Sequence, residues 1–363
     1  MAGILVQFGT SRFLQAHVDL FLHEARLAGQ DVPDIVVVQT SGAPGRSGRV
    51  AAFGDPAGFP VVIRGLEDGA PVEREIRVKS VRRGLSTAAD WAEIRRLFVD
   101  EARFVVSNTG DRGYEVTGRP DPAAEAPDPA FPGKLAQLLH ARWRAGRPGL
   151  NVLPCELIER NGRRLESLVR DIAAGADPAF GQWLAAEVVF ADTLVDRIVS
   201  EPIEPVGAVA EPYALWAIED RPGLELPCAH PAIRRLAALE PAERLKLHIL
   251  NLGHTVLAGI WQDERRAADE TVRAILADPG PRGRLEAIYR DEVLPGFAAR
   301  GMGAEAAAYL ETTMARFRNP YLDHRLADIA ANHDQKVERR IRAYLDWAGT
   351  PAPRLAAIAG VTA

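Results

Sequence analysis

The stretch Ile4–Leu22, ILVQFGTSRFLQAHVDLFL, decides the fold of the chain. It opens with a short apolar run, Ile4–Phe8, that stops at Gly9, which is the pattern of a buried strand followed by a turn. The residues after this turn, up to about Ala28, carry apolar side chains at helical spacing. A second apolar run, Ile35–Val38, follows after the length of a βαβ unit. The N-terminal region therefore predicts parallel strands joined by a helix.

Two further runs, Phe104–Val106 and Val152–Leu153, have the same short, β-branched character and extend the predicted sheet. The Pro-rich and Ala-rich stretch 119–132 predicts a surface loop, and 201–231 predicts irregular chain. Beyond about Pro241, long helical patterns cover 245–261, 269–277, 284–289, 305–315 and 324–347. We therefore expect an α/β fold, with an open-sheet domain over 1–239 followed by a mostly α-helical domain over 240–363.

Composition narrows the class of partner. The chain has 363 residues, 47% of them hydrophobic, and a formal net charge of -5, which gives no basic field for nucleic acid or an anionic membrane. It opens without a signal-peptide pattern and contains no apolar run of about 20 residues, so we expect a cytoplasmic protein. Cys155 and Cys228 lack CxxC spacing and are expected to be buried small hydrophobes. A small-molecule substrate and a monomer or small homo-oligomer are the expectation.

Gly9 falls where a strand meets a helix N-terminus, a place that favours a phosphate group. The usual dinucleotide fingerprint has three glycines, whereas Gly9 is followed by Thr10 and Ser11. Taken alone, this turn leaves two interpretations open, a cofactor site or an ordinary connection.

Four segments decide between them. They are QFGTSRFLQAH at 7–17, FADTLVDRIVS at 190–200, KLHILNLGH at 246–254, and RFRNP at 316–320 with Lys336 beyond it. With these segments the chain resembles the polyol-specific long-chain dehydrogenases, the mannitol dehydrogenase family, over nearly its whole length. The most specific match is K-x-x-x-x-N-x-x-H, formed by Lys246, Asn251 and His254.

The resemblance implies an oxidoreductase acting on CH–OH groups, with a Rossmann-like N-terminal domain that binds NAD(H), with NADP(H) as the alternative. It implies a catalytic set of Lys246, Asn251 and His254, with Glu243 beside them. Lys336 and Asp196 are the implied substrate contacts. The implied cofactor-binding residues are Phe8, Gly9, Thr10, Ser11, Phe13, Asn108, Thr109 and Asp196.

The chemistry of alcohol oxidation fits this set. Loss of hydride from a secondary alcohol requires a base for the hydroxyl proton, and the reverse reaction requires an acid; one desolvated lysine can serve as both. Leucines and Ile249 around Lys246 supply an apolar setting. On an α-helix of about 100° per residue, Asn251 lies about 140° and His254 about 80° from Lys246, so all three share one half of the surface. The alternative is a solvated lysine with hydrogen-bonded fillers.

His248 falls about 200° from Lys246 on the same helix, so we expect it to be a structural filler. The spacing of the histidines matches no zinc-site pattern, and no metal is expected.

Two departures from the mannitol dehydrogenase pattern bear on the substrate. PCEL at 154–157 stands in place of Ser-Cys-Asp-Asn, so a second oxyanion donor is absent at Leu157, and Asn161 is near but shifted. Asp328 stands where mannitol dehydrogenases carry a substrate-contacting Arg. Both departures, and the Ser-Asn-Thr run at 107–109, resemble the tagaturonate reductases (altronate oxidoreductases) of the family. The helical domain is also shorter than in the usual member.

We therefore expect hydride transfer to or from a sugar acid of the tagaturonate/altronate or fructuronate/mannonate type. Lys336 is the candidate cation for the substrate carboxylate, with Asp328 pairing with Lys336 or with Arg325. The alternatives are a mannitol-type polyol 2-dehydrogenase, a non-catalytic cofactor-binding regulator, and a sugar-acid lyase or isomerase that needs no hydride carrier.

Cofactor preference is the last expectation. Sites that prefer NAD usually place an acid at the end of the second strand, but this strand ends in Gln39 and Thr40. Arg46 and Arg49 follow, either to meet a 2′-phosphate or as ordinary loop charges. We expect that NADH is used and that NADPH is not strongly rejected.

Overall fold

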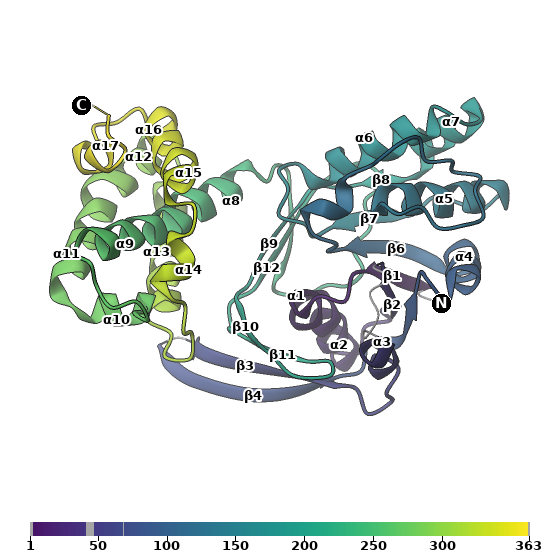
Figure 1. Ribbon diagram of the computed structural model, residues 1–363, viewed down its shortest axis with the longest axis horizontal. Helices are drawn as coiled ribbons and strands as arrows, with labels where there is room; N and C mark the ends of the chain where they lie inside the picture. The colour runs from purple at the N-terminus through teal and green to yellow at the C-terminus, as the bar shows by residue number, and fades with distance from the viewer. Residues whose placement is uncertain (1–2, 41–46, 68, 362–363) are drawn as a thin grey trace. The chain divides into compact units, whose positions relative to one another are not determined.

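The computed structural model describes residues 3–40, 47–67 and 69–361 (Figure 1). The chain forms two compact units. The sheet unit comprises the residues before Arg64 together with Arg74–Leu239, and the helical unit comprises Arg64–Glu73 together with Glu240–Ala363. We keep residue 239 as the proposed domain boundary.

The sheet unit is built on a six-stranded sheet whose paired neighbours are all parallel, with the order β5-β2-β1-β6-β7-β8. Counted along the chain within this sheet, the order is the one found in dinucleotide-binding folds, and it reverses between β1 and β6. The predicted open α/β sheet is confirmed. Its strands are β1 (Ile4–Phe8), β2 (Asp34–Gln39), β5 (Val81–Ser86), β6 (Ala102–Ser107), β7 (Asn151–Pro154) and β8 (Val189–Phe190).

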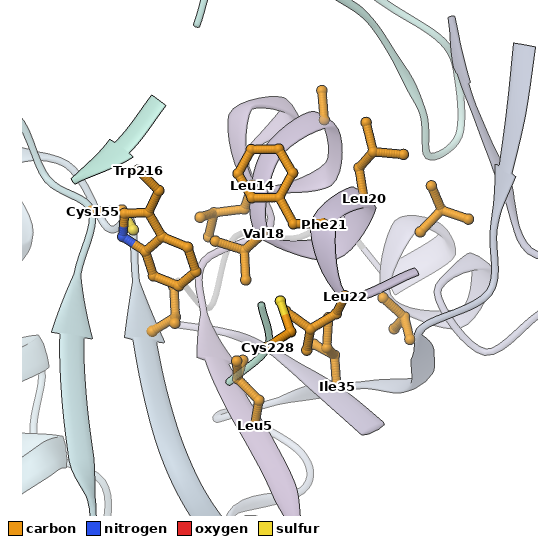
Figure 2. Close-up of a cluster of buried hydrophobic side chains, with 14 of the residues drawn as sticks. Leu5, Leu14, Val18, Leu20, Phe21, Leu22, Ile35, Cys155, Trp216 and Cys228 are labelled. Atoms are coloured by element: carbon orange, nitrogen blue, oxygen red, sulfur yellow. The ribbon is translucent and has the colours of Figure 1, made fainter. Parts of the chain in front are cut away.

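Both faces of this sheet are buried in its centre, which explains why β1 and β2 are nearly continuous apolar runs. Leu5 and Ile35 face a core beneath the first helical segment (Figure 2), whereas Phe8 and Val36 face the opposite core. The first core lies under α1 (Arg12–Leu14), the π-helix η1 (Gln15–Asp19) and α2 (Leu20–Leu27). The second lies under α4 (Trp91–Asp100), α5 (Phe131–Arg144), α6 (Asn161–Ala173) and α7 (Pro178–Glu187). Cys155 and Cys228 are buried thiols in the first core, as predicted.

The other strands of the described residues form two smaller sheets. The prediction of irregular chain over 201–231 was wrong, because β11 and β12 lie within it and β10 ends in it. These strands are short and β10 ends in a proline, so their alternation is too brief to stand out. The four-stranded sheet is β10 (Val199–Pro202), β11 (Ala208–Ala210), β3 (Phe59–Glu67) and β4 (Ala70–Val78). The three-stranded sheet is β13 (Ile233–Leu236), β12 (Leu215–Glu219) and β9 (Thr193–Asp196).

The far end of the β3–β4 hairpin groups with the helices rather than with its own sheet. There the Arg64 guanidinium lies over the ring of Tyr321, 5.5 Å from its centroid. Nothing in the sequence pattern predicted this contact. The remaining short segments of the sheet unit are α3 (Ser47–Ala52) and the 3-10 helix η2 (Asp111–Tyr114).

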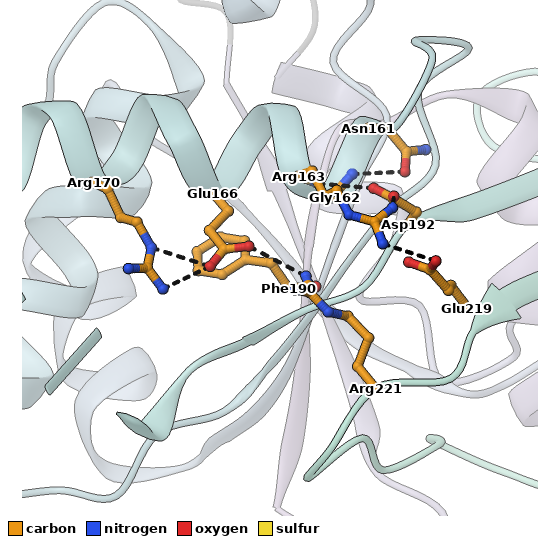
Figure 3. Close-up of polar contacts among 9 residues, drawn as sticks. All are labelled: Asn161, Gly162, Arg163, Glu166, Arg170, Phe190, Asp192, Glu219 and Arg221. Atoms are coloured by element: carbon orange, nitrogen blue, oxygen red, sulfur yellow. Dashed lines mark hydrogen bonds and ion pairs between the residues drawn. The ribbon is translucent and has the colours of Figure 1, made fainter. Parts of the chain in front are cut away.

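Ion pairs fix α6 over the ends of the neighbouring strands (Figure 3). Arg163 pairs with Asp192 and, at 2.9 Å, with Glu219 on β12. One turn later, Glu166 accepts hydrogen bonds from Arg170 at 2.7 Å and from Arg221 at 3.2 Å. Most of these guanidinium groups are partly exposed, so each pair contributes modestly and the network acts mainly by fixing position.

The helical unit contains the predicted helices, with one correction. The pattern over 324–347 is not one helix: it breaks at Asn332, whose φ of 56° lies in the left-handed region that ends helical hydrogen bonding. Among the described residues, no helix has the length and apolar character needed to span a membrane. The elements are α8 (Glu240–Leu245), η3 (Lys246–Asn251), α9 (Leu252–Asp263), α10 (Val272–Ala277), α11 (Pro279–Ile288), η4 (Tyr289–Val293), α12 (Leu294–Ala299), α13 (Gly303–Phe317), α14 (Leu326–Ala330), α15 (His333–Val337), η5 (Glu338–Arg342), α16 (Ala343–Ala348) and α17 (Pro353–Ile358).

His17 sits fully buried on η1 between two aromatic rings. Its centroid lies 4.6 Å from that of Phe13 and 4.5 Å from that of Phe21, and its Nε2 lies 3.0 Å from the carbonyl oxygen of Leu215. Burial lowers the pKa of the His17 imidazole to about 3. The folded chain therefore holds this ring neutral across the physiological range.

We predict that His17 makes the sheet unit sensitive to acid. Below the ordinary histidine pKa of about 6.5, His17 is protonated in the unfolded chain but stays neutral in the folded chain. The free energy of unfolding therefore falls by up to about 1.4 kcal/mol per pH unit until the pKa of the folded state is reached. Urea unfolding of wild type and His17→Gln at pH 7 and pH 5 measures this loss. The variant should be less stable at pH 7 and lose less stability on acidification. Equal losses in both proteins would contradict the assignment.

Candidate active site

The point where the strand order reverses holds a backbone contact that only glycine permits. Gly9 follows β1 with a φ of +116°, and a Cβ there would lie 2.5 Å from the carbonyl oxygen of Asn108. The Gly9 N–H donates to the carbonyl oxygen of Val38 at 3.0 Å, and the Asn108 N–H donates to the carbonyl oxygen of Phe8 at 2.9 Å. The ends of β1, β2 and β6 are thus joined at the crevice where such folds bind their ligands.

The rest of the turn leads directly into the first helix. The Ser11 hydroxyl accepts from the Leu14 N–H at 3.3 Å and caps the helix, and the Gln15 amide donates to the Thr10 carbonyl at 3.3 Å. Phe13 packs on His17. The Phe8 side chain lies in the core against Phe131, with centroids 5.1 Å apart, so Phe8 faces the turn only through its backbone.

Glu156 fixes the loop after β6. Its buried carboxylate accepts hydrogen bonds from the Ser107 hydroxyl at 2.9 Å, the Thr109 N–H at 2.9 Å and the Tyr114 hydroxyl at 3.0 Å. Burial raises the pKa of the Glu156 carboxyl, while these donors oppose the shift. Asn108 is held in turn by its bond to the Cys155 carbonyl at 2.8 Å. The PCEL run predicted a departure from the family pattern but not this clamp.

The neighbours of Glu156 provide no substitute oxyanion donor. Leu157 is 78% exposed and has no polar group to offer. The buried Asn161 amide donates at 3.0 Å each to the carbonyls of Pro154, Glu156 and Thr193. Asn161 therefore joins α6 to β7 and β9 and has no donor left for a substrate.

The Val-Asp-Arg segment, residues 195–197, covers the last two residues of β9 and the residue after it. Asp196 is buried at the end of this strand. Arg197 donates to the carbonyls of Ala16 at 2.6 Å and Glu211 at 3.0 Å. Burial lowers the pKa of the Arg197 guanidinium to about 10, so it remains charged. Arg197 thus ties β9 to the first helical segment.

In the helical unit, Lys246 and Asn251 are the first and last residues of the π-helix η3. An i→i+5 hydrogen-bonding pattern has more residues per turn than the i→i+4 pattern of an α-helix. The angle of 140° predicted between Lys246 and Asn251 assumed an α-helix and does not apply here, because the two residues lie about one π-helical turn apart. Both are half-buried, and the half-buried Glu243 precedes them on α8.

Donors from outside the segment bind carbonyl groups of η3. The Tyr289 hydroxyl donates to Ile249 at 2.7 Å, and the Arg340 Nη1 donates to Asn251 at 3.3 Å. A Cβ on Gly253, in the turn that follows, would lie 1.9 Å from the Tyr289 hydroxyl. Gly253 therefore leaves the space that this hydroxyl needs.

His254 is buried one turn after Asn251. Its ring centroid lies 4.5 Å from that of Phe317 and 4.8 Å from that of His324. The pKa of the His254 imidazole is held well below its usual value, first by burial and then by the positive charges of His324, Arg316, Arg340 and Lys336. A neutral His254 presents one donor and one acceptor. His324 was not predicted, although it follows the RFRNP segment closely.

The remaining predicted residues divide as follows. The Lys336 ammonium donates to the Ile329 carbonyl at 2.7 Å, and Asp328 pairs with Arg325 at 3.1 Å rather than with Lys336. His248 is a buried filler, as predicted: its ring stacks on Trp347, and its Nδ1 lies 3.2 Å from the Arg340 carbonyl. Within the described ranges, no cluster of three His, Cys, Asp or Glu residues is arranged to hold a metal.

Comparison with known proteins identifies the family. Residues 4–227 match the mannitol dehydrogenase Rossmann domain, and residues 238–360 match the mannitol dehydrogenase C-terminal domain. The chain belongs to the mannitol dehydrogenase family. The family predicted from the four sequence segments is confirmed, and with it the expectation of an oxidoreductase.

Two curated relatives show the match, and both are altronate oxidoreductases. The chain is 29% identical to an altronate oxidoreductase of Bacillus subtilis (strain 168), over 97% of this chain and 77% of the relative. It is 31% identical to an altronate oxidoreductase of Klebsiella pneumoniae (strain 342), over 93% of this chain and 73% of the relative.

Solved structures share the fold. A D-sorbitol dehydrogenase in substrate-free form superposes with a TM-score of 0.75 at 20% identity, covering 94% of this chain and 76% of the other. The mannitol 2-dehydrogenase of Pseudomonas fluorescens, solved as a ternary complex with NAD and D-mannitol, gives 0.75 at 20% identity, covering 98% and 77%. The order of a Rossmann-like domain followed by a helical domain is therefore that of mannitol dehydrogenases.

We predict that Gly253→Ala disturbs the π-helix without touching a proposed catalytic group. The added methyl displaces the Tyr289 hydroxyl from the Ile249 carbonyl, at a cost of about 1–3 kcal/mol as for other overpacked sites. Urea unfolding and steady-state turnover should show lower stability and at least tenfold slower turnover. The matched control is Gly283→Ala on α11, where a Cβ meets no atom within 4 Å. Equal behaviour of the two variants would contradict the role given to this contact.

Proposed function

We propose that this chain is an NAD(P)-dependent oxidoreductase that interconverts a ketohexuronate and its hexonate, of the tagaturonate/altronate or fructuronate/mannonate type. The observation that carries the proposal is the alignment of the altronate oxidoreductases with more than nine-tenths of the chain. The Lys246, Asn251 and His254 set on η3 and α9 supports it.

The turn after β1 fits a nicotinamide dinucleotide. Gly9 leaves open the space that a Cβ would fill against Asn108, and the helix that begins at Arg12 directs its first N–H groups toward the turn. The backbone of 9–11 would hold the dinucleotide, together with Asn108, which is bonded to the Cys155 carbonyl, and Thr109, which is held by Glu156. When bound, NAD(H) supplies or accepts the hydride.

Arg49 bears on the choice between NAD and NADP. Its guanidinium lies 3.3 Å from the Glu204 carboxylate and donates to the Pro205 carbonyl at 3.2 Å. A 2′-phosphate would have to compete with Glu204 for this cation, which favours NAD(H). Arg46, the other candidate, lies outside the described residues.

The proposed proton chemistry lies on one helical face. In the reductive direction, Lys246 protonates the oxygen of the carbonyl as hydride arrives, and in the oxidative direction it takes the hydroxyl proton back. Asn251, about one π-turn away, donates to the developing oxyanion. The neutral His254 orients a substrate hydroxyl, and Glu243 guides the proton path. Lys336 contacts the substrate from α15, and Asp196 is the contact proposed from β9.

We predict that Lys246→Ala abolishes turnover while the fold persists, because the site has no second acid/base in its place. Residues of this kind contribute about 10²- to 10⁴-fold to the rate. NADH oxidation with a panel of ketohexuronates measures the loss, and circular dichroism checks the fold. The exposed Lys79→Ala serves as control and should retain activity. More than about a tenth of wild-type activity in Lys246→Ala is outside that range and would remove the assignment.

We also predict that the enzyme prefers the charged substrate. A ketohexuronate should exceed the matching neutral ketose at least about tenfold in kcat/KM, or roughly 1.4 kcal/mol of transition-state binding, because a cation meets its carboxylate. An activity screen with NADH and NADPH over sugar acids and polyols measures both preferences. Faster turnover of mannitol or fructose than of every uronate would replace this proposal with a polyol 2-dehydrogenase.

A further inference from the structure

The surroundings of His254 carry more positive charge than the reaction at Lys246 requires. The cations Arg316, Arg340 and Lys336 lie close enough to lower the pKa of the His254 imidazole, and His324 acts in the same direction when it is protonated. Like charges gathered in a half-buried place favour the binding of an anion. In a chain with a net charge of -5, this local excess of cations indicates an anionic ligand.

Arg340 is the cation of this set whose guanidinium has N–H donors that no hydrogen bond within the described residues uses. Its Nη1 donates to the Asn251 carbonyl at 3.3 Å and to the Thr255 hydroxyl at 3.1 Å. Across 3–40, 47–67 and 69–361, it forms no ion pair, and its Nε and Nη2 have no hydrogen-bond partner. Burial, with the neighbouring charge of Arg339, lowers the pKa of its guanidinium, so the group is partly desolvated.

Lys336 is less well placed for the same task. Its ammonium group is already committed to the Ile329 carbonyl at 2.7 Å, at the end of α14. Arg340 follows Lys336 by four residues, so the two side chains emerge from neighbouring turns. A guanidinium also presents two parallel N–H groups that match the two oxygens of a carboxylate, whereas an ammonium acts as a point charge.

The hydrogen bond from Arg340 to the Asn251 carbonyl places the guanidinium near the group proposed to bind the reacting oxygen. Asn251 is the proposed donor to the reacting oxygen, and Arg340 binds the main-chain carbonyl of the same residue. In a ketohexuronate the carboxylate carbon is four bonds from the reacting carbon, a span of about 5 Å at ordinary bond lengths. This span is comparable with the distance between the side-chain amide and the carbonyl oxygen of one residue.

We infer that Arg340 is the residue that selects a carboxylated sugar, by receiving the distal carboxylate of the substrate on Nε and Nη2 while Nη1 holds the Asn251 carbonyl. This inference rests on the proposed function and names the residue behind its substrate preference. Arg340 thereby couples recognition of the charged end of the sugar to the position of the π-helix.

A dead-end complex tests this without turnover. With NADH bound, a hexonate cannot react, because cofactor and sugar are both reduced, so calorimetry measures binding alone. We would titrate D-altronate and the neutral D-altritol into the NADH complexes of wild type, Arg340→Gln, Lys336→Met and Arg339→Gln. Arg339 is an exposed neighbour with the same charge and serves as the control. Gln at 340 keeps an N–H donor for the Asn251 carbonyl.

The expected result is that wild type binds altronate at least tenfold more tightly than altritol. Arg340→Gln should bind altronate at least tenfold more weakly with altritol changed less than twofold, whereas Arg339→Gln should match wild type. Equal weakening of both ligands in Arg340→Gln would reduce Arg340 to a structural support and overturn the inference. The inference would also be overturned if wild type bound altronate and altritol equally, or if the preference for altronate were lost only in Lys336→Met.

Two further measurements keep the outcomes separate. If Arg340→Gln does not fold, Arg340→Lys replaces it: the charge remains but the paired N–H groups are lost, so altronate alone should weaken at least threefold, and an unchanged affinity contradicts the inference. Turnover of ketohexuronates by wild type tests the proposed function independently. Uronate turnover with an intact altronate preference in Arg340→Gln would overturn this inference while the proposed function stands.

Discussion

The change from α-helical to π-helical hydrogen bonding across Lys246–Asn251 is the constraint on which the site of the helical unit depends. It places Lys246 and Asn251 about one turn apart, with four residues between them. It also leaves carbonyl groups that accept bonds from Tyr289 and Arg340. Because these donors come from other helices, the positions of Lys246 and Asn251 depend on the packing of the whole unit.

In the sheet unit, the proposed site is fixed by a different kind of interaction. Its site depends on a main-chain contact between Gly9 and Asn108, which brings two strand ends together where the strand order reverses. The Glu156 clamp then immobilises the loop that follows β6. In both units a glycine removes a Cβ at the place of closest approach, and a buried polar group fixes the segment beside it.

Patterns within one element were predictable, and contacts between elements were not. The runs at Ile4–Phe8 and Ile35–Val38 predicted buried parallel strands because both faces of the sheet are covered. The short strands within 201–231 and the break at Asn332 escaped prediction, since each depends on pairing or backbone conformation that composition does not encode. The K-N-H motif supplied three residues of the proposed site, but the prediction assumed α-helical angles. Arg340 and Glu156 carry no motif of their own, and only the fold reveals what they bind.

The central claim is that this member of the mannitol dehydrogenase family transfers hydride between a nicotinamide and the ketone carbon of a sugar acid. The most direct measurement uses NADH carrying deuterium at the transferable position of C4, with mass spectrometry or NMR of the hexonate formed. The account predicts one deuterium on the carbon that was the ketone, with one NADH consumed per hexonate. A product that forms without deuterium, or without loss of NADH, would show a lyase or isomerase and contradict the account.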